Sequence, residues 1–191
     1  MEVREFMNSR SKRSIIDQPI VKSQYTIHQS AFSLLFCELV EYSQGKSSTI
    51  QELQNRLAES GKHIGYRIVD LIVTRDKNFR RETRVINMLM FIKTVFWRTL
   101  FNKDADKLEQ ANDDSSIYYL IETEPITNKF ISTPKDKGNF NCASFVAGII
   151  EAALEQCCFP NKVTVHWHQG TTFMIKFDDS VVKREKRLSA K

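Results

Sequence analysis

Hydrophobic positions follow first a helical period and then a strand period between residues 141 and 177. Apolar residues recur at helical spacing after Asn141, whose side-chain oxygen can accept a backbone N–H and cap a helix. Pro160 ends this pattern, and apolar and polar residues then alternate over 163–168 and 173–177. Gln169-Gly170 lies between these two runs. The stretch therefore predicts a helix followed by a two-stranded hairpin with a two-residue turn.

The predicted helix after Asn141 is built mainly from small residues. They are Ala143, Ser144, Ala147, Gly148, Ala152 and Ala153. Small side chains let neighbouring elements approach the helix backbone closely. We therefore expect this helix to form a layer between the sheet and other helices.

Apolar residues nearly encircle the predicted first helix, from Ser30 to about Ser43. A surface helix normally carries one apolar stripe of about 100°, so this helix is expected to be buried on two sides. In a small domain, the second side can be covered by another protein chain. The expected subunit interface consists of Phe32, Leu35, Phe36 and Leu39 with Ile64 and Ile68 of the next helix.

The second predicted helix begins at a capping box, in which Thr49 and Glu52 satisfy exposed backbone donors. Its apolar face continues to about Val73. Gly61 and Gly65, four residues apart, predict a close contact with a neighbouring helix. A third long helix is expected from Val85 to Leu100, with Phe91, Val95 and Trp97 widening its apolar face.

Polar residues and short apolar runs separate this helix from Asn141. The stretch 104–114 predicts a short exposed helical turn, whereas 117–121 and 129–132 predict strands. With the hairpin, these elements predict an α+β domain with helices packed on one face of a four-stranded antiparallel sheet.

Length and charge divide the chain into three parts. At 191 residues and 41% hydrophobic, it fits one domain over 26–178, between a flexible N-terminal segment (1–25) and a basic C-terminal tail (179–191). The net charge is +5, yet residues 25–178 hold equal numbers of basic and acidic residues. A neutral body argues against nucleic-acid binding. Basic tails can be solvated ends or can attract an anionic membrane surface or an acidic protein.

Targeting and cysteine patterns predict a soluble, intracellular protein. No apolar run approaches the roughly 20 residues of a membrane span, and the basic N-terminus lacks the apolar run of a signal peptide. The four cysteines form no CxxC pair and no spaced framework, so we expect free thiols.

Candidate catalytic groups are few. Cys142 at a helix start and His166 on a following strand form an order similar to that of papain-like cysteine peptidases and acyltransferases. The sequence indicates no third group to orient the imidazole, so a cysteine-dependent acyltransferase or hydrolase stays an alternative. His166 and His168 share one strand face but lack further ligands, and the glycines form no nucleotide-binding fingerprint. We therefore expect no catalytic residue, no metal and no cofactor.

Five segments together resemble a known family: 29–40 (QSAFSLLFCELV), 81–84 (RETR), 105–114 (ADKLEQANDD), 141–145 (NCASF) and 166–172 (HWHQGTT). They occur in the order seen in the small core subunits of TRAPP, the transport protein particle. The resemblance covers about residues 27–178, and the ADKLEQANDD run and the HWH-x-GTT hairpin are its most specific parts.

This resemblance implies an α/β-plait domain that pairs through its helices with related TRAPP subunits. It further implies a non-catalytic subunit of a tethering complex that acts as guanine-nucleotide exchange factor for a Rab-type GTPase in ER-to-Golgi and Golgi traffic. Such a chain would be cytoplasmic and peripheral at Golgi and endoplasmic reticulum membranes.

One segment departs from the family pattern. A paralogous TRAPP subunit carries an acylated cysteine just before its Phe-Arg-Glu-Thr block, with the lipid in a tunnel through the domain. Here the corresponding residues 76–83 read DKNFRRET, with an additional arginine and no cysteine. We therefore expect no acylation at this site.

Overall fold

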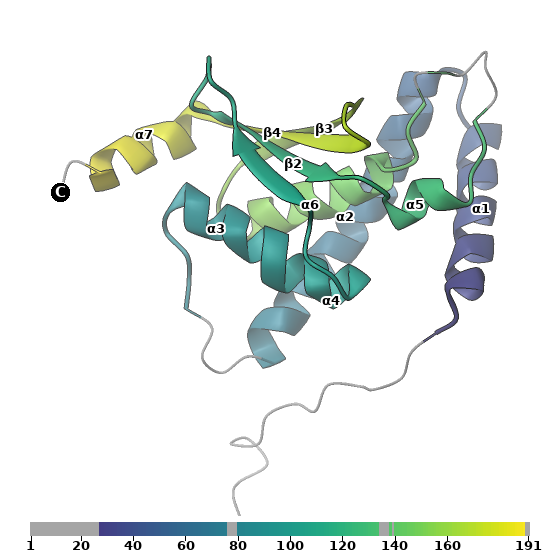
Figure 1. Ribbon diagram of the computed structural model, residues 1–191, viewed down its shortest axis with the longest axis horizontal. Coiled ribbons are helices and arrows are strands. Elements are labelled where there is room, and N and C mark those ends of the chain that lie inside the picture. Colours follow the sequence, from purple (N-terminus) through teal and green to yellow (C-terminus); the bar gives the residue numbers. More distant parts are fainter. Residues whose placement is uncertain (1–26, 76–79, 134–137, 139, 190–191) are drawn as a thin grey trace, which may run out of the picture.

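A computed structural model describes residues 27–75, 80–133, 138 and 140–189 (Figure 1). The elements are α1 (Gln29–Gly45), α2 (Ile50–Arg75), α3 (Val85–Phe91), the π-helical turn η2 (Ile92–Phe96), α4 (Trp97–Phe101), β1 (Lys107–Gln110), β2 (Ile117–Glu122), α5 (Ile126–Lys129), α6 (Ser144–Gln156), β3 (Asn161–Trp167), β4 (Thr171–Phe177) and α7 (Asp179–Ser189). Within these residues, no helix combines the length and the apolar character needed to cross a membrane.

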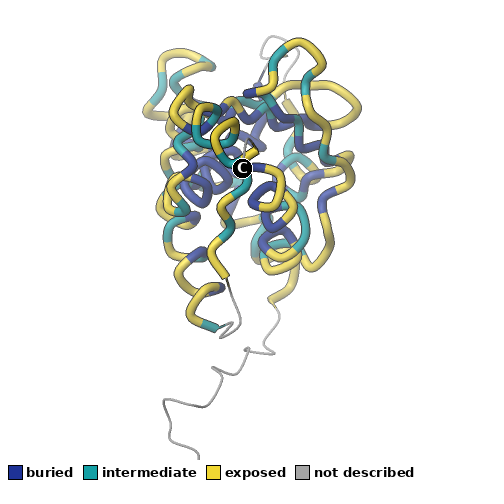
Figure 2. Tube along the Cα trace, turned by 90° about the vertical axis from the view of Figure 1, so that its left-hand side faces the viewer, coloured by how far each residue is buried: buried dark blue, intermediate teal, exposed yellow. Residues whose placement is uncertain are grey.

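The four strands form one antiparallel sheet in the order β1-β2-β4-β3. Leu120, Phe173 and Val165 lie opposite one another on three adjacent strands and turn toward the helices. The helical layer lies beneath the sheet in Figure 1, and buried residues gather in the middle of the molecule (Figure 2). The predicted α+β fold, with helices on one face of a four-stranded antiparallel sheet, is confirmed.

Helix α6 lies between the sheet and α2, as its small residues predict. The two helices are so close that a Cβ atom added at Gly61 would lie 2.0 Å from the Phe145 carbonyl oxygen. A Cβ at Gly148 would lie 1.9 Å from the Ala58 carbonyl oxygen. Glycine is therefore required on both sides of this contact, which confirms the close approach predicted from Gly61 and Gly65.

The third predicted helix is continuous from α3 to α4 but contains the π-helical turn η2. Trp97 lies about three α-helical turns beyond Ile86, so in an uninterrupted α-helix the two would share a face. Ile86 is exposed, whereas Trp97 is only 1% exposed and Val95 faces solvent. The wider π turn shifts the register by about one residue and turns the indole into the core.

Two expected elements before α6 were wrong. Residues 107–110 form the edge strand β1, which pairs with β2, instead of a helical turn. Only Leu108 of this strand is partly buried, so its sequence lacks the apolar alternation that would identify a strand. The strand expected at 129–132 is absent from the described residues, where Pro125 precedes the short helix α5. Proline suits a helix start because its missing N–H is not needed there.

The boundaries of the hairpin and its helix also differ from the prediction. Helix α6 begins at Ser144, and Asn141 forms a turn before it, with its Oδ1 accepting the Ala143 N–H at 2.9 Å. The hairpin loop has three residues, because Trp167 pairs with Thr171. Gln169 and Gly170 in this loop have φ values of 48° and 95°.

The two ends of the chain have different outcomes. The predicted basic tail is largely helix α7, which packs on the body through the buried Val181. The segment 1–25, expected to be flexible, lies outside the described residues.

At the start of α2 the capping box is confirmed: Glu52 N–H donates to Thr49 Oγ1 at 3.1 Å, and Ser48 N–H donates to Glu52 Oε2 at 2.9 Å.

Candidate protein interface

Helix α1 is attached to the body along one narrow line. Only Phe36, Val40 and Ser43 of its 17 residues are buried. The Phe36 ring stands edge-on to Phe145 of α6, with ring centroids 5.2 Å apart, and stacks on Phe32 at 5.7 Å. Aromatic pairs of this kind stabilise a contact beyond the area they bury. This line holds α1 in place and leaves the remainder of the helix open.

The outer side of α1 carries large apolar side chains. Leu34, Leu35 and Tyr42 have exposed fractions of 70%, 71% and 62%. Single exposed apolar residues are common, but neighbouring ones on a helix mark a surface that a partner covers. The second apolar side predicted for this helix is therefore present and faces solvent.

Helix α2 adds apolar side chains on the flank of the face that contacts α6. Ile64, Ile68 and Leu71 recur at helical spacing, and Ile64 and Leu71 are exposed. The neighbouring face, which includes Gly61 and Gly65, packs against α6. We call the exposed apolar side chains of α1 and α2, which are Leu34, Leu35, Tyr42, Ile64 and Leu71, the outer helical face.

The six residues predicted for the interface fall into three groups. Leu35 and Ile64 are exposed on the outer helical face, and Phe32, Leu39 and Ile68 are partly buried at its edge. Phe36 corrects the prediction, because it is 4% exposed and belongs to the core of the single chain. Leu34, Tyr42 and Leu71 are also exposed and were not among the six predicted residues.

Cys142 does not have the environment of a catalytic thiol. It is 3% exposed, and burial raises its pKa to about 12, with the nearby Cys37 contributing in the same direction. His166 lies on β3, where its Nε2 is 3.0 Å from Thr164 Oγ1. The described residues contain no hydrogen bond that joins Cys142 to His166. The thiol is therefore protonated at neutral pH, and the alternative of a cysteine-dependent acyltransferase or hydrolase gains no support.

The histidines of the hairpin are exposed on β3 and its loop. Over the described ranges, no group of three or more His, Cys, Asp or Glu side chains is placed to hold a metal ion. His166 and His168 thus have no neighbouring ligand that would complete a site.

A buried carboxylate on α6 joins three elements. Glu151 accepts hydrogen bonds from Lys62 of α2 at 3.0 Å, from Lys162 of β3 at 3.3 Å and from the Val163 N–H at 3.1 Å. Burial raises the pKa of this carboxyl, but the hydrogen bonds from the Val163 N–H and Lys62 together lower the pKa by more. The pKa of Glu151 is therefore below its ordinary value. Glu151 is therefore ionised and structural.

A second buried carboxylate, Glu122, ends β2. It accepts a hydrogen bond from Trp97 Nε1 at 3.1 Å and pairs with Lys103, whose side chain is half exposed. Burial raises the pKa of Glu122 above its ordinary value, and Lys103 only partly opposes this. The indole that the π turn directs inward thus has a specific acceptor.

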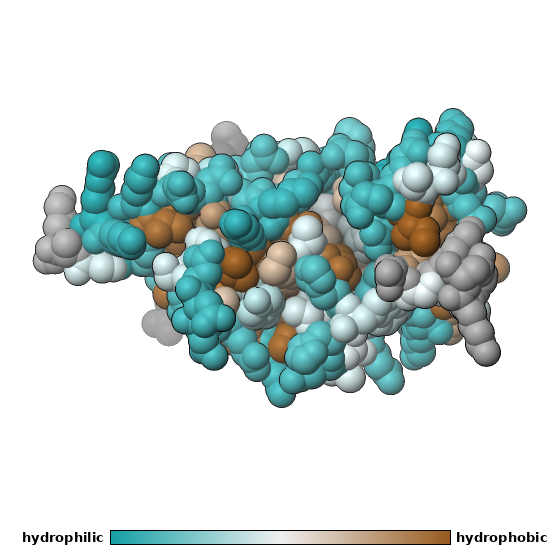
Figure 3. Space-filling model, turned by 90° about the horizontal axis from the view of Figure 1, so that it is seen from above, coloured by the Kyte–Doolittle hydropathy of each residue, from teal (hydrophilic) through white to brown (hydrophobic). Residues whose placement is uncertain are grey.

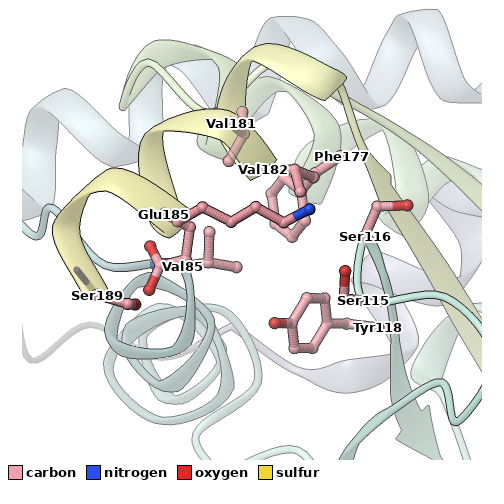
Figure 4. A pocket seen from close by; sticks show the side chains of 10 residues that line it. Val85, Ser115, Ser116, Tyr118, Phe177, Val181, Val182, Glu185 and Ser189 are labelled. Carbon is pink, nitrogen blue, oxygen red and sulfur yellow. The ribbon is translucent and has the colours of Figure 1, made fainter.

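Helix α7 is joined to the start of α3 by a reciprocal pair of caps. Glu185 of α7 accepts the Val85 N–H at 3.2 Å, at the first turn of α3. Arg84 donates to the Leu188 carbonyl at 2.7 Å, near the end of α7, and also pairs with Glu185. Each side chain thus satisfies backbone groups that a helix end leaves without an intrahelical partner. Between α7, α3 and β2 lies a cavity of about 390 Å³ (Figure 4).

Comparisons with known proteins extend over most of the chain. The family model described as transport protein particle (TRAPP) component matches residues 32–178. The chain is 48% identical over 183 residues to trafficking protein particle complex subunit 5 of Gallus gallus, covering 96% of this chain and 97% of the relative. It is 38% identical to trafficking protein particle complex subunit 5 of Dictyostelium discoideum, and the match covers 92% of this chain and 98% of that relative.

A solved structure has the same fold. It is trafficking protein particle complex subunit 3 from Naegleria fowleri, covalently bound to palmitic acid. The TM-score is 0.70, the identity is 13%, and the match covers 79% of this chain and 95% of that one. In the present chain, residues 76–79, at the start of the segment in which acylation is not expected, lie outside the described residues.

Proposed function

Because the chain belongs to the transport protein particle (TRAPP) component family, we propose that it acts as a non-catalytic subunit 5 of the trafficking particle. The family resemblance and the near full-length similarity to subunit 5 chains support this role. The buried, protonated thiol of Cys142 supports the non-catalytic part of the proposal.

The single observation that carries the proposed mode of assembly is the outer helical face. Leu34 and Leu35 of α1 are each about 70% exposed, and α2 adds Ile64 and Leu71. Burying a fully exposed side chain of this kind contributes roughly 1.5–3 kcal/mol, and each residue here contributes in proportion to its exposed fraction. A related TRAPP subunit that presents its own apolar helices would bury this face and gain that free energy.

Assembly would give the chain its place in membrane traffic. We infer that the complete particle is a tether and a guanine-nucleotide exchange factor for a Rab-type GTPase in ER-to-Golgi and Golgi traffic. The chain would then be cytoplasmic and peripheral at Golgi and endoplasmic reticulum membranes. Its own contribution would be to hold neighbouring subunits in the arrangement that exchange requires.

The test is co-purification of the tagged full-length chain with coexpressed TRAPP small subunits, followed by sizing and nucleotide-release assays. The variant Leu35→Asp/Ile64→Asp places two charges on the outer helical face and should abolish assembly. The matched control, Ile86→Asp/Met90→Asp, changes two similarly exposed apolar residues of α3. It should still co-purify with the TRAPP subunit that binds the outer helical face of the wild-type chain.

Three results would each contradict a part of the proposal. A wild-type chain that elutes as a stable monomer with no affinity for any TRAPP subunit would remove the assembly role. Retention of all partners by the doubly charged variant would show that assembly uses another surface. Unchanged nucleotide release from a Rab-type GTPase when the chain is left out of the particle would remove only its contribution to exchange.

A further inference from the structure

We propose that the outer face of α7 is a contact surface for an anionic membrane. This inference rests on the membrane association proposed for the particle, but it assigns the contact to residues of this chain. The surface consists of Lys183, Lys186 and Arg187 on α7, together with Lys176 on the adjacent strand β4.

The cations of α7 project on one side of the helix. Lys183, Lys186 and Arg187 follow the i, i+3, i+4 spacing and are exposed, whereas Val181 faces the core and is 1% exposed. Among the described residues, none of these three cations forms an ion pair with a carboxylate. The acidic residue in the middle of this helix, Glu185, turns away from them and pairs with Arg84. The three cations are thus exposed and unpaired among the described residues, and Lys186 also borders the cavity between α7, α3 and β2.

The orientation of this face is fixed by the body of the protein. Arg84 holds the C-terminal end of α7 through Leu188 and Glu185. Arg184 lies over the Phe159 ring at 4.4 Å and donates to the Cys158 carbonyl at 3.0 Å. These contacts leave little freedom for the helix to rotate, so the cations are presented in a constant direction.

The charge continues onto the outer side of the sheet. Lys176 precedes the buried Phe177 by one residue and therefore points away from the helices, whereas Lys162 opposite it reaches Glu151 of α6. Seen from above, the face is mostly hydrophilic, and hydrophilic side chains project around α7 at the left end (Figure 3). Lys162 pairs with Glu151 and contributes less free charge.

The acidic groups around this face lie at its margin. Asp178 and Asp179 are exposed at the opposite, N-terminal end of α7. Asp114 is ionised and near Lys176, because hydrogen bonds from the Ser116 hydroxyl and N–H lower the pKa of its carboxyl, so it partly offsets the charge of Lys176. The net charge of the exposed C-terminal half of α7 is therefore positive.

An apolar cavity next to these cations favours a lipid over an acidic protein. Val85, Tyr118, Phe177, Val181 and Val182 are among the side chains that line this space, and Phe177 lies beside Val182 (Figure 4). Lys186 belongs to the same lining. A lipid surface supplies negative head groups and apolar chains together, and anionic head groups attract each nearby Lys or Arg.

The experiment is flotation of the full-length chain with two kinds of vesicle, pure phosphatidylcholine or the same lipid with 30% phosphatidylserine. We expect binding to the anionic vesicles that weakens as salt is raised, because screening shortens the reach of the charges. The variant Lys183→Gln/Lys186→Gln/Arg187→Gln should bind about a hundredfold more weakly. Glutamine keeps good helix propensity, so α7 should still form.

The matched control is Arg67→Gln/Lys107→Gln/Lys129→Gln, which removes three exposed cations from other elements. It changes the net charge equally and should reduce binding less than threefold. Equal losses in both variants would overturn the assignment to α7. Failure of the wild-type chain to prefer anionic vesicles would overturn the membrane proposal and favour an acidic protein as partner. Co-purification with TRAPP subunits is measured separately, so loss of assembly cannot be mistaken for loss of lipid binding.

Discussion

Helices α1 and α6 both carry abundant apolar residues, but the chain uses them differently. In α6, every residue from Ser144 to Leu154 is buried by the sheet on one side and α2 on the other. In α1, three residues are buried, Phe32 and Leu39 are partly buried, and Leu34, Leu35 and Tyr42 remain exposed. Where α6 contacts neighbouring elements, it has glycine and alanine. On its outer side α1 has leucine and tyrosine, and no other element of the described chain covers them.

This comparison separates two meanings of an apolar pattern. Small apolar residues around a helix indicate contacts that the chain makes with itself, because they allow backbones to meet. Large apolar residues on a side that the fold leaves uncovered indicate free energy that becomes available only when a partner binds. Substitutions of buried residues should therefore weaken folding, whereas substitutions on the outer helical face should weaken assembly and leave folding nearly unchanged.

The largest effect on folding is expected for Gly148→Val. Any Cβ at this position would lie 1.9 Å from the Ala58 carbonyl oxygen, so α2 and α6 must move apart. We expect a loss of more than about 4 kcal/mol in the free energy of unfolding, measured by urea denaturation. The control is Gly45→Ala in α1, where a Cβ meets nothing within 4 Å. It should be neutral or stabilising by up to about 1 kcal/mol, and equal losses at both positions would contradict the comparison.

A smaller but still large loss is expected for Phe36→Ala, which removes the ring that attaches α1 to Phe145. We expect about 3 kcal/mol, because a buried aromatic side chain and its packing are lost together. Leu35→Ala, one residue away on the exposed side, should change the free energy of unfolding by less than about 0.5 kcal/mol. If Leu35→Ala proved as destabilising as Phe36→Ala in the isolated chain, α1 would be buried on both sides without a partner.

The third prediction concerns the charge that α6 buries. Glu151→Gln should cost about 1–2 kcal/mol at pH 7, because the ionised carboxylate bonded to Lys62 and Val163 is lost. The pKa of Glu151 is lowered from 4.5, so its stabilisation is present above that pH and is lost as pH falls through the folded-state pKa. Wild type and variant should therefore converge in thermal unfolding curves recorded well below pH 4.5. A constant difference at all pH values would mean that packing, not charge, is responsible.

The smallest effect, with the opposite sign, is expected for Glu122→Gln at the end of β2. Burial raises the pKa of this carboxyl, so its contribution is favourable below pH 4.5 and is lost as pH rises through the higher folded-state pKa. Glutamine can still accept the Trp97 N–H without a buried charge. We expect the variant to equal or exceed the wild type at pH 7, by up to about 1 kcal/mol. A clear loss at neutral pH would show that the Lys103 pair outweighs the burial of charge.

The sequence was sufficient for elements whose periodicity is long and whose ends carry chemical signals. Local patterns predicted three features that the structure contains. They are the helix start at Thr49, the close helix contact at the glycines of α2, and the strands β3 and β4 with their apolar alternation. The fold class also follows from the order of these elements. The outer helical face was partly predictable for the same reason, since Leu35 and Ile64 lie on regular helical patterns.

The remaining features depend on contacts between distant segments. Strand β1 has too few apolar residues to be recognised alone and exists because β2 pairs with it. The inward turn of Trp97 requires the π turn, which side-chain periodicity cannot distinguish from a broad apolar face. The inward position of Phe36 requires Phe145, more than a hundred residues away in the chain.

The reciprocal caps of α3 and α7 also have a consequence for biosynthesis. Arg84 and Glu185 are 101 positions apart, so the first turn of α3 receives its cap only after nearly the whole chain has been synthesised. Chains grow from the N-terminus, and contacts of high sequence separation form late. Nascent chains and products truncated before Glu185 would therefore expose an uncapped α3 start and the uncovered Val85. Cellular quality control could thus detect incomplete synthesis at a site in the middle of the sequence.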